Sequence, residues 1–357
     1  MIDDLLLLYE TFLKLKTEMT TPSYHRELIE IDRHALWHPF TQMQDWMSED
    51  PLVIEKGKGV YLWDTLGRRY YDGYSSLWVN IHGHQKKEIN QAVENQLKMI
   101  SHSTFLGLSN IPAIQLAQRL TQIAPKELSR VFYSDNGSTA LEIAVKMAFQ
   151  YWQHQGGAFA KKVKYVSFVN AYHGDTIGTM SLGGIPLFQD LFKSLYYPTY
   201  KIESPTCYRC PLSLEFPDCH LACTESLEKI LKEHHAEISA IVMEPGVQAA
   251  GGMVVLPSGF LQKVRALATE FQVLLILDEV ATGFGRTGRM FACEIEGVIP
   301  DILAVAKGLT GGYLPLAATL TTERIYEAFL GKYDAFKTFF HQPDFCLKCF
   351  QGLFFLE

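Results

Sequence analysis

One run of residues limits the folds open to this chain more than any other: Val273-Leu-Leu-Ile-Leu277, followed at once by Asp278 and Glu279. Five consecutive aliphatic residues predict a strand buried on both faces, which is typical of a parallel sheet covered by helices. Two adjacent acids at the end of such a strand are not explained by packing. The run therefore predicts an α/β fold whose strand ends carry polar groups.

Comparable units recur along most of the chain. The segments typical of strands are 130–134, 164–169, 238–243, 273–277 and 302–306. Periodicity and capping signals predict helices over 86–99, 112–124, 224–236 and 258–271, and another after the turn at 134–138. This alternation predicts a mostly parallel, doubly wound sheet. Residues 52–80 differ, because their aromatic residues and turn signals favour a small β-rich segment.

Composition and charge exclude several classes of function. The chain has 357 residues, of which 48% are hydrophobic and 20% charged, as in ordinary soluble globular proteins. A net charge of −7 without a long basic tract gives no electrostatic support for binding nucleic acid. Apolar runs such as Leu5–Leu8 are far shorter than the ~20 residues that a membrane helix needs, so no membrane span is expected.

The N-terminal residues and the cysteines indicate a cytoplasmic protein. Residues 1–32 begin with acidic charges and lack a small-residue cleavage site, so we interpret them as an extension and not a secretory signal. Motif-like sequence begins only near Arg33, which makes Met19 an alternative to Met1 as the natural start. Seven cysteines, an odd number, indicate a reducing compartment.

Four of the cysteines lie close together: Cys207, Cys210, Cys219 and Cys223. Short pairs of this kind resemble a zinc knuckle. The spacer between the pairs is short, which favours reduced thiols that pack a surface loop. We therefore predict no metal, and the zinc site stays an alternative.

Ligand-binding residues of a doubly wound sheet lie at the carboxyl ends of its strands. At the first such end, Gly137 and Ser138 begin a helix, and their free N–H groups suit a phosphate, although a plain capped turn is also possible. At the second end, Tyr172 is suited to stack on a planar ligand or simply to lie at a sheet edge. Asp278 needs a cationic partner if it is buried, and we expect Glu279 to face solvent or a neighbouring helix.

Lys307 follows the apolar strand at 302–306. Its side chain could extend to solvent, or it could be a desolvated amine of depressed pKa, suited to bond a carbonyl carbon. Asp278 and Lys307 end consecutive strands, so we expect them at neighbouring strand ends. A lysine, an acid, a phosphate turn and an aromatic ring are together what pyridoxal 5'-phosphate requires.

The motifs in this order resemble those of class III, fold-type I aminotransferases, and the resemblance covers about residues 33–341. It is carried by Trp37-His-Pro-Phe-Thr-Gln-Met43, Ser75-Ser-Leu-Trp-Val-Asn-Ile-His-Gly83, Ser134-Asp-Asn-Gly-Ser138, Tyr172-His-Gly-Asp-Thr176, Glu244-Pro-Gly-Val-Gln248, Asp278-Glu-Val-Ala-Thr-Gly-Phe-Gly-Arg-Thr-Gly288 and Lys307-Gly-Leu-Thr-Gly-Gly312. The first two segments resemble most closely the branch that aminates 8-amino-7-oxononanoate to 7,8-diaminononanoate in biotin biosynthesis. A class III aminotransferase for ω-amino acids or diamines is the alternative.

The resemblance implies a role for each matching residue. The catalytic residues would be Lys307, which carries the cofactor and moves the proton, and Asp278, which bonds the pyridinium nitrogen. Gly137, Ser138, Tyr172 and Gln248 would also contact the cofactor. The substrate would meet Trp78, Phe40, Tyr172 and Lys307, and Arg286 lies in a loop suited to contact a carboxylate. The family also implies a homodimer, with sites between subunits.

Two features depart from the family. Phe40 stands where the enzymes that use S-adenosylmethionine have tyrosine, so lysine is an alternative amino donor, although we expect S-adenosylmethionine. After His341 the family's continuation is replaced by an apolar tail, 342–357. We therefore expect a C-terminal small domain that is largely missing, and an inactive truncated product is a further alternative. The expected domains are a β-rich segment of the small domain at 33–85 and a large cofactor-binding domain at 86–341.

Overall fold

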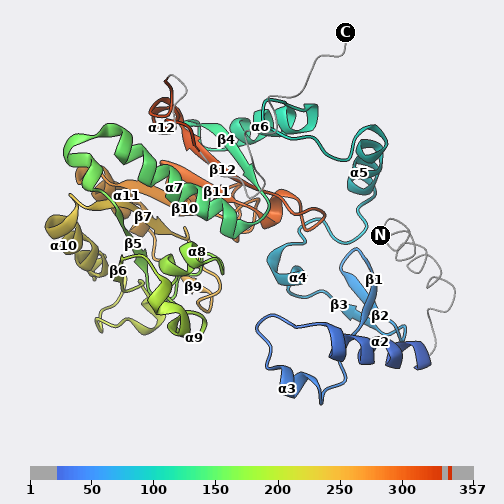
Figure 1. Ribbon diagram of the computed structural model, residues 1–357. Coiled ribbons are helices and arrows are strands. Elements are labelled where there is room, and N and C mark those ends of the chain that lie inside the picture. Colours follow the sequence, from blue (N-terminus) through green and yellow to red (C-terminus); the bar gives the residue numbers. More distant parts are fainter. Residues whose placement is uncertain (1–21, 332–336, 340–357) are drawn as a thin grey trace, which may run out of the picture. The chain divides into compact units, whose positions relative to one another are not determined.

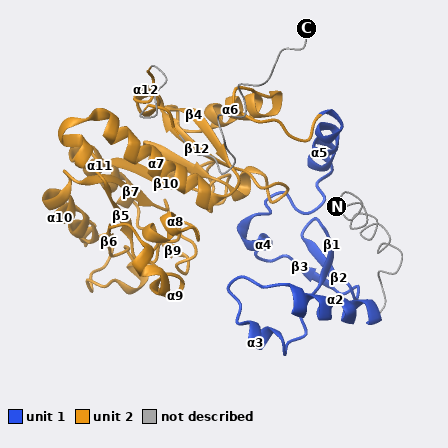
Figure 2. Cartoon of the chain, in the orientation of Figure 1, with its two compact units in different colours: residues 1–99 blue, residues 100–357 orange. Residues whose placement is uncertain are grey.

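The computed structural model describes residues 22–331 and 337–339. The two candidate start residues, Met1 and Met19, and the tail at 342–357 lie outside the described residues. The chain forms two compact units, 1–99 and 100–357, shown in different colours in Figure 2. The division falls after the helix predicted at 86–99, whereas we expected a domain boundary before it; the functional domains stay a prediction.

The first unit contains the predicted β-rich segment. Its helices are α2 (Pro22–Ala35), α3 (Met43–Trp46), α4 (Ser75–Trp78) and α5 (Lys87–Met99), and its antiparallel sheet has the order β1 (Ile54–Lys58), β2 (Tyr61–Asp64), β3 (Arg69–Tyr71). The sheet is anchored by Asp64, which is fully buried and accepts hydrogen bonds from Arg68 Nε (2.6 Å) and Tyr70 Oη (2.9 Å).

The short helix α4 has the opposite hand from every ordinary protein helix. Its four residues, none of them glycine, have φ of 56°, 47°, 66° and 65°. A left-handed turn costs roughly 1–2 kcal/mol per residue for L-amino acids, because Cβ lies too close to the following carbonyl oxygen. The turn can persist only if surrounding contacts hold it.

The second unit is built on a seven-stranded sheet of order β4-β12-β11-β10-β7-β5-β6. The strands are β4 (Leu128–Ser134), β5 (Lys164–Phe168), β6 (Thr199–Ile202), β7 (Ile238–Met243), β10 (Leu274–Asp278), β11 (Ile302–Val305) and β12 (Ala317–Thr322). A separate pair consists of β8 (Val247–Gln248) and β9 (Val254–Val255). The helices are α6 (Ile111–Ile123), α7 (Gly137–Gln155), α8 (Ile177–Leu182), α9 (Pro186–Gln189), α10 (Glu225–His234), α11 (Phe260–Glu270) and α12 (Glu323–Glu327).

This sheet confirms the predicted α/β class. Every adjacent pair from β11 to β6 is parallel, and only β12 runs antiparallel to its neighbours β11 and β4. The five predicted strands and four of the predicted helices are present within a few residues, and the helix expected after 134–138 is α7. Strands β6 and β12 were not predicted.

Strand β10 shows why a continuous aliphatic run was needed. Leu275 and Leu277 belong to one hydrophobic core, which includes residues of α6, α10 and α11. Leu274 and Ile276 point the other way, into a second core with residues of α7 and α12. Successive side chains of a strand alternate between faces, so both faces of this sheet are covered and the unit has three layers (Figure 1).

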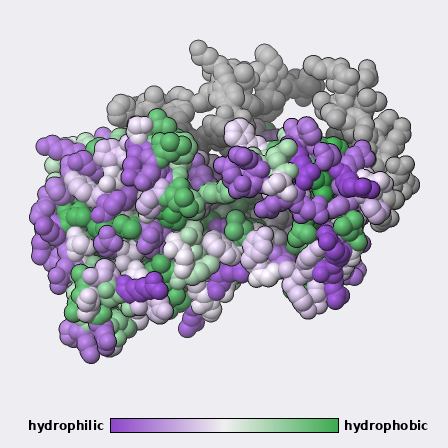
Figure 3. Space-filling model, turned by 90° about the horizontal axis from the view of Figure 1, so that it is seen from below, coloured by the Kyte–Doolittle hydropathy of each residue, from purple (hydrophilic) through white to green (hydrophobic). Residues whose placement is uncertain are grey.

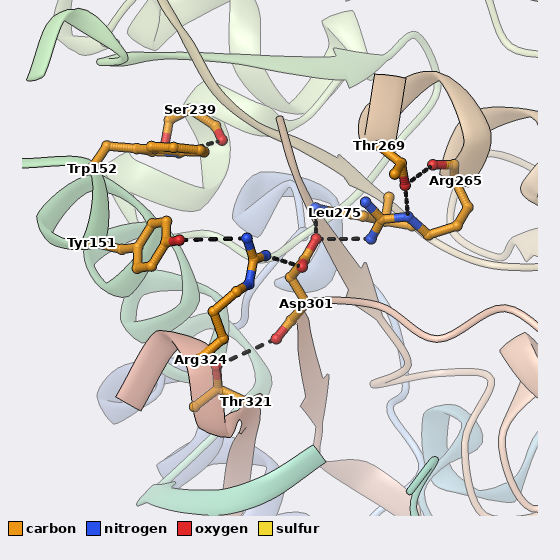
Figure 4. Close-up of polar contacts among 9 residues, drawn as sticks. All are labelled: Tyr151, Trp152, Ser239, Arg265, Thr269, Leu275, Asp301, Thr321 and Arg324. Carbon is orange, nitrogen blue, oxygen red and sulfur yellow. Dashed lines mark hydrogen bonds and ion pairs between the residues drawn. The ribbon is translucent and has the colours of Figure 1, made fainter. Parts of the chain in front are cut away.

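The amino ends of the central strands are tied to two helices by one buried acid, Asp301 (Figure 4). Its carboxylate accepts hydrogen bonds from Leu275 N (2.8 Å), from Arg265 Nη1 on α11 (2.8 Å) and from Arg324 Nη2 on α12 (2.6 Å). Arg324 also lies 3.4 Å from the hydroxyl of Tyr151. This cluster is structural and lies at the opposite edge of the sheet from the predicted site.

Within residues 22–331 and 337–339, no helix is both long and apolar enough to cross a membrane. On the face viewed in Figure 3, apolar side chains lie among hydrophilic ones. Several large apolar residues are strongly exposed, among them Trp37 (89%), Phe40 (71%) and Ile111 (65%).

Candidate active site at the carboxyl edge of the sheet

The candidate site residues of the second unit follow strands that point the same way. Asp278 ends β10, and Lys307 comes two residues after β11, whose Ala304 pairs with Asp278. Glu244 follows β7, the loop 170–175 follows β5, and Gly137 begins α7 after β4. The parallel arrangement therefore brings all of them to one edge of the sheet, as predicted.

The centre of the cluster is a buried acid–imidazole pair. Asp278 is 4% exposed, and its Oδ2 lies 2.7 Å from His173 Nδ1, while its Oδ1 accepts from Val280 N at 3.0 Å. The hydrogen-bonding partner of Asp278 is an imidazole, from a loop 105 residues away. The expected cationic partner of Asp278 stays a prediction. His173 Nε2 is buried and has no hydrogen-bond partner among the described residues.

Lys307 begins a short 3₁₀ turn (Lys307–Leu309) and has a positive φ of 29°, which is unusual for a residue with a side chain. Burial lowers the pKa of its amine; the charges of Asp278 and Glu244 oppose this shift, and Arg286 adds to it. A lowered pKa raises the fraction of neutral, nucleophilic amine. These features favour the desolvated amine over a side chain that extends to solvent.

Glu244 is a member of the cluster that sequence reasoning did not select as a site residue. It is 4% exposed and accepts hydrogen bonds from the backbone N–H groups of Tyr172 (3.2 Å) and Ala249 (3.0 Å). Burial raises its pKa to about 7, with His173 opposing the shift and Asp278 adding to it. The one sequence signal was its position directly after β7.

The start of α7 has the features of an anion-binding helix end. Asn136 and Thr139 form a capping box, in which Asn136 Oδ1 accepts from Thr139 N (3.0 Å). The box leaves the first N–H groups of this 19-residue helix, on Gly137 and Ser138, outside the helical ladder. A Cβ on Gly137 would lie 2.7 Å from Val280 Cγ1, so glycine lets the helix end approach the residues after β10.

Glycine also lets the β5 loop reach the same helix end. A Cβ on Gly174 would lie 1.9 Å from Ser138 Oγ, and Gly174 has φ of 122°. In this loop Tyr172 Oη donates to Asp175 Oδ2 at 2.6 Å, and the Tyr172 ring packs edge-on against Phe188. The loop therefore brings Tyr172 and His173 to the cluster from one side.

Gln248 closes the cluster at β8. It is 2% exposed, and its Nε2 donates to the Val169 carbonyl at 3.2 Å. Its Oε1 is buried without a hydrogen-bond partner among the described residues. An unpaired buried acceptor is costly, so Gln248 Oε1 is suited to bind a donor group of a ligand.

Three further residues were predicted for the site: Phe40, Trp78 and Arg286. Phe40 and Trp78 belong to the first unit, where Phe40 is exposed with φ of 53° and Trp78 is half-buried on the left-handed turn. Arg286 is exposed, and within the described residues it has no ion pair, although its charge acts on Lys307.

Of the two expectations for Glu279, exposure to solvent is wrong, and the side chain instead faces the start of the 3₁₀ helix Ala292–Glu296. Its side chain is fully buried and accepts hydrogen bonds from Ala292 N (2.7 Å), Cys293 N (2.9 Å) and Thr282 Oγ1 (3.2 Å). Burial raises the pKa of Glu279, and these hydrogen bonds oppose the shift. Glu279 therefore fixes the loop that follows β10, and its neighbour Asp278 is left to the site.

The four clustered cysteines line one small cavity, together with apolar residues such as Leu212, Leu214 and Phe216. In the described part of the chain, no three potential ligand side chains are grouped to hold a metal ion. Burial and the neighbouring thiols raise the pKa of Cys223 to about 11, which disfavours the thiolate. The arrangement supports packed, reduced thiols.

Comparison with known proteins identifies the family. A model described as "Aminotransferase class-III" matches residues 43–353, a range that ends within the tail. The adenosylmethionine-8-amino-7-oxononanoate aminotransferase of Geobacter sulfurreducens is 51% identical over 326 residues, which cover 91% of this chain and 72% of that protein. The enzyme of the same name from Nitratidesulfovibrio vulgaris is 52% identical over 88% of this chain, which spans only 58% of that relative's length.

Solved structures that are similar to this chain are also aminotransferases. The adenosylmethionine-8-amino-7-oxononanoate aminotransferase of Methanocaldococcus jannaschii is similar with a TM-score of 0.83 at 43% identity, over 89% of this chain and 70% of that one. An (S)-enantioselective ω-transaminase from Thermomicrobium roseum has a TM-score of 0.81 at 37% identity, over 85% and 67%. The chain belongs to the class III aminotransferases, a family of enzymes that depend on pyridoxal phosphate.

Proposed function

We propose that this chain transfers an amino group to 8-amino-7-oxononanoate, giving 7,8-diaminononanoate in biotin biosynthesis, with S-adenosylmethionine as the donor. The observation that carries the proposal is that similar proteins bear the name of one and the same enzyme. Proteins that bear this enzyme's name are 50–54% identical to the chain over 87–91% of its length. Lysine is the alternative donor, because Phe40 replaces the tyrosine of the S-adenosylmethionine-dependent enzymes.

The residues at the sheet edge fit pyridoxal phosphate. The free N–H groups of Gly137 and Ser138 suit its phosphate, and the buried acid Asp278 suits its ring nitrogen. The buried Oε1 of Gln248, which has no hydrogen-bond partner in the described part of the chain, is suited to contact the cofactor. Tyr172 lies beside Glu244 and can cover the ring, and Lys307 offers an amine of lowered pKa to the aldehyde.

Bound pyridoxal phosphate supplies an electron sink for the carbon that loses or gains the amino group. Asp278 would hold a proton at the ring nitrogen, since an ionised carboxylate stabilises a pyridinium in a site shielded from water. His173 donates to Asp278 and so fixes the direction of that carboxylate. Lys307 Nζ would carry the proton between the substrate carbon and the cofactor, because burial lowers the pKa of this amine and so makes its neutral, proton-accepting form more accessible.

Trp78 and Phe40 would contact the substrate, and Arg286 would contact a carboxylate. We also propose a cytoplasmic homodimer. The strongly exposed apolar side chains of Trp37, Phe40 and Ile111 support it, since such residues commonly lie in contacts between subunits.

A second candidate is a class III transaminase for ω-amino acids or diamines. The likeness to the Thermomicrobium roseum ω-transaminase favours it, because the folds agree nearly as well as with the Methanocaldococcus jannaschii enzyme. The Trp37–Met43 and Ser75–Gly83 segments favour the first candidate.

The test is to purify the full chain, add pyridoxal phosphate, and measure product from 8-amino-7-oxononanoate with S-adenosylmethionine or lysine. We expect 7,8-diaminononanoate, and borohydride should fix the cofactor to Lys307. Product only from diamines or ω-amino acids would select the second candidate. Cofactor fixed to Lys307 without turnover of any of these substrates would refute the proposed transamination.

A further inference from the structure

The left-handed turn Ser75–Trp78 is held by one buried carboxylate, that of Asp72. The side chain of Asp72 is 4% exposed. Its Oδ1 accepts from Ser76 N at 2.7 Å, and its Oδ2 accepts from Ser76 Oγ at 2.8 Å. Both bonds go to the residue with the smallest φ of the turn, 47°. The carboxylate therefore compensates a backbone conformation that serine would otherwise avoid.

His84 approaches the same carboxylate from beyond the turn. Asn80 Nδ2 donates to His84 Nδ1 at 2.9 Å, which leaves the ring proton on Nε2. His84 Nε2 then donates to Asp72 Oδ2 at 2.9 Å. Burial alone would raise the pKa of Asp72, but the hydrogen bonds from Ser76 and His84 lower it, so the acceptor stays ionised.

The ring of His84 is itself fixed to the β1–β2 hairpin. The backbone of His84 exchanges two hydrogen bonds with Gly59, of 2.9 and 2.8 Å. A Cβ on Gly57 would lie 2.7 Å from His84 Cγ, so the imidazole rests directly on the β1 backbone. Asp72 N donates to the Val60 carbonyl at 2.9 Å. Both ends of the turn are thus anchored to the same hairpin.

We propose that Asp72 and His84 are positioning residues that hold this left-handed turn and thereby orient Trp78 for the amino acceptor. The inference rests on the proposed function, which gives Trp78 its contact with substrate. Trp78 is the last residue of the turn, with φ of 65°, and its N–H donates to the Tyr74 carbonyl at 2.8 Å. If the turn relaxes, the indole changes direction.

The test compares variants of the full chain with cofactor bound. Asp72→Asn and His84→Leu should raise KM for 8-amino-7-oxononanoate about tenfold with a smaller change in kcat. His84→Gln, which keeps a donor near the Nε2 position, should restore KM. Adding Ser76→Gly to Asp72→Asn should also restore it, because glycine adopts the left-handed conformation without help.

A second readout separates this inference from the proposed function. Acrylamide quenching of Trp78 is taken as the difference between each protein and its Trp78→Phe counterpart, and it should change in Asp72→Asn and recover with Ser76→Gly. Glu94→Gln, which neutralises an exposed carboxylate on α5 of the same unit, should change neither KM nor this quenching.

Unchanged quenching in Asp72→Asn, no rescue by Ser76→Gly, or an equal effect of Glu94→Gln would overturn the positioning role. If the unmodified chain does not aminate 8-amino-7-oxononanoate, the proposed function fails. The quenching series then still decides whether Asp72 and His84 hold the turn.

Discussion

Replacing Glu244 with glutamine should remove a pH dependence that this buried carboxyl imposes on folding. The pKa of Glu244 is raised from its ordinary 4.5 to about 7, chiefly by burial. Below pH 4.5 the group is protonated in both the folded and the unfolded chain and contributes nothing. As the pH rises from 4.5 to 7, the unfolded chain releases the proton while the folded chain keeps it, so stability falls.

The size of the effect follows from the shift. Each pKa unit corresponds to 1.36 kcal/mol, so the free energy of unfolding should fall by ~3 kcal/mol in total and stay constant above pH 7. The Glu244→Gln variant lacks this pH-dependent contribution to the free energy of unfolding. Its amide can accept from only one of the two N–H groups, on Tyr172 and Ala249, which costs ~1–2 kcal/mol at every pH. We therefore expect the variant to be less stable at pH 5 and more stable at pH 8.5.

The assay is urea unfolding of the cofactor-free proteins, followed by circular dichroism between pH 5 and 8.5. The difference in unfolding free energy between the variant and the unmodified chain should change by ~2.5 kcal/mol over this range. Other groups titrate in both proteins and cancel in that difference. The exposed Glu127→Gln serves as the control and should give a constant difference. If the free energy of unfolding depends on pH in the same way in Glu244→Gln and in the unmodified chain, the raised pKa of Glu244 is refuted.

Three further predictions concern the same edge of the sheet. Lys307→Ala should bind cofactor only reversibly, with no borohydride-fixed product and no transamination; normal turnover would contradict its role. Asp278→Asn should retain cofactor but lower kcat by about a hundredfold or more in steady-state assays, since a neutral amide does not hold the ring proton. Glu279→Ala should lower the unfolding free energy by ~2–5 kcal/mol in urea, because Ala292 N and Cys293 N lose their acceptor, and an unchanged midpoint would count against this buried role.

Much of the sheet could be predicted because its central strands are uniform aliphatic runs. Two strands could not. Strand β12, Ala-Ala-Thr-Leu-Thr-Thr, contains three threonines that resemble a polar connection, yet Thr319 is buried because its hydroxyl donates to the Ala140 carbonyl. Strand β6 has four residues after a long loop, which is too short for a clear pattern. Both depend on tertiary partners that no local window contains.

The candidate site, like the sheet, was predicted only in part. Strand order alone predicted that Asp278 and Lys307 are neighbours, since each follows its own buried strand. The partner of Asp278 could not be predicted, because the direction of the His173 loop is set by Gly174 packing against Ser138. The role of Glu279 was missed for a similar reason. The N–H groups that donate to its carboxylate, on Ala292 and Cys293, come near it only when the loop after β10 folds back.

The place of β12 has a consequence for synthesis on the ribosome. This strand lies between β4 and β11, and it pairs with β4 residues made almost two hundred positions earlier, such as Phe132 with Thr319. Until residue 322 has left the ribosome, β4 has no neighbour and the inner edge of β11 is unpaired, and both are templates for wrong pairing. Such long-range closure makes folding slow. We therefore expect nascent chains that stop before β12 to need chaperones, and chains that include it to be released from them.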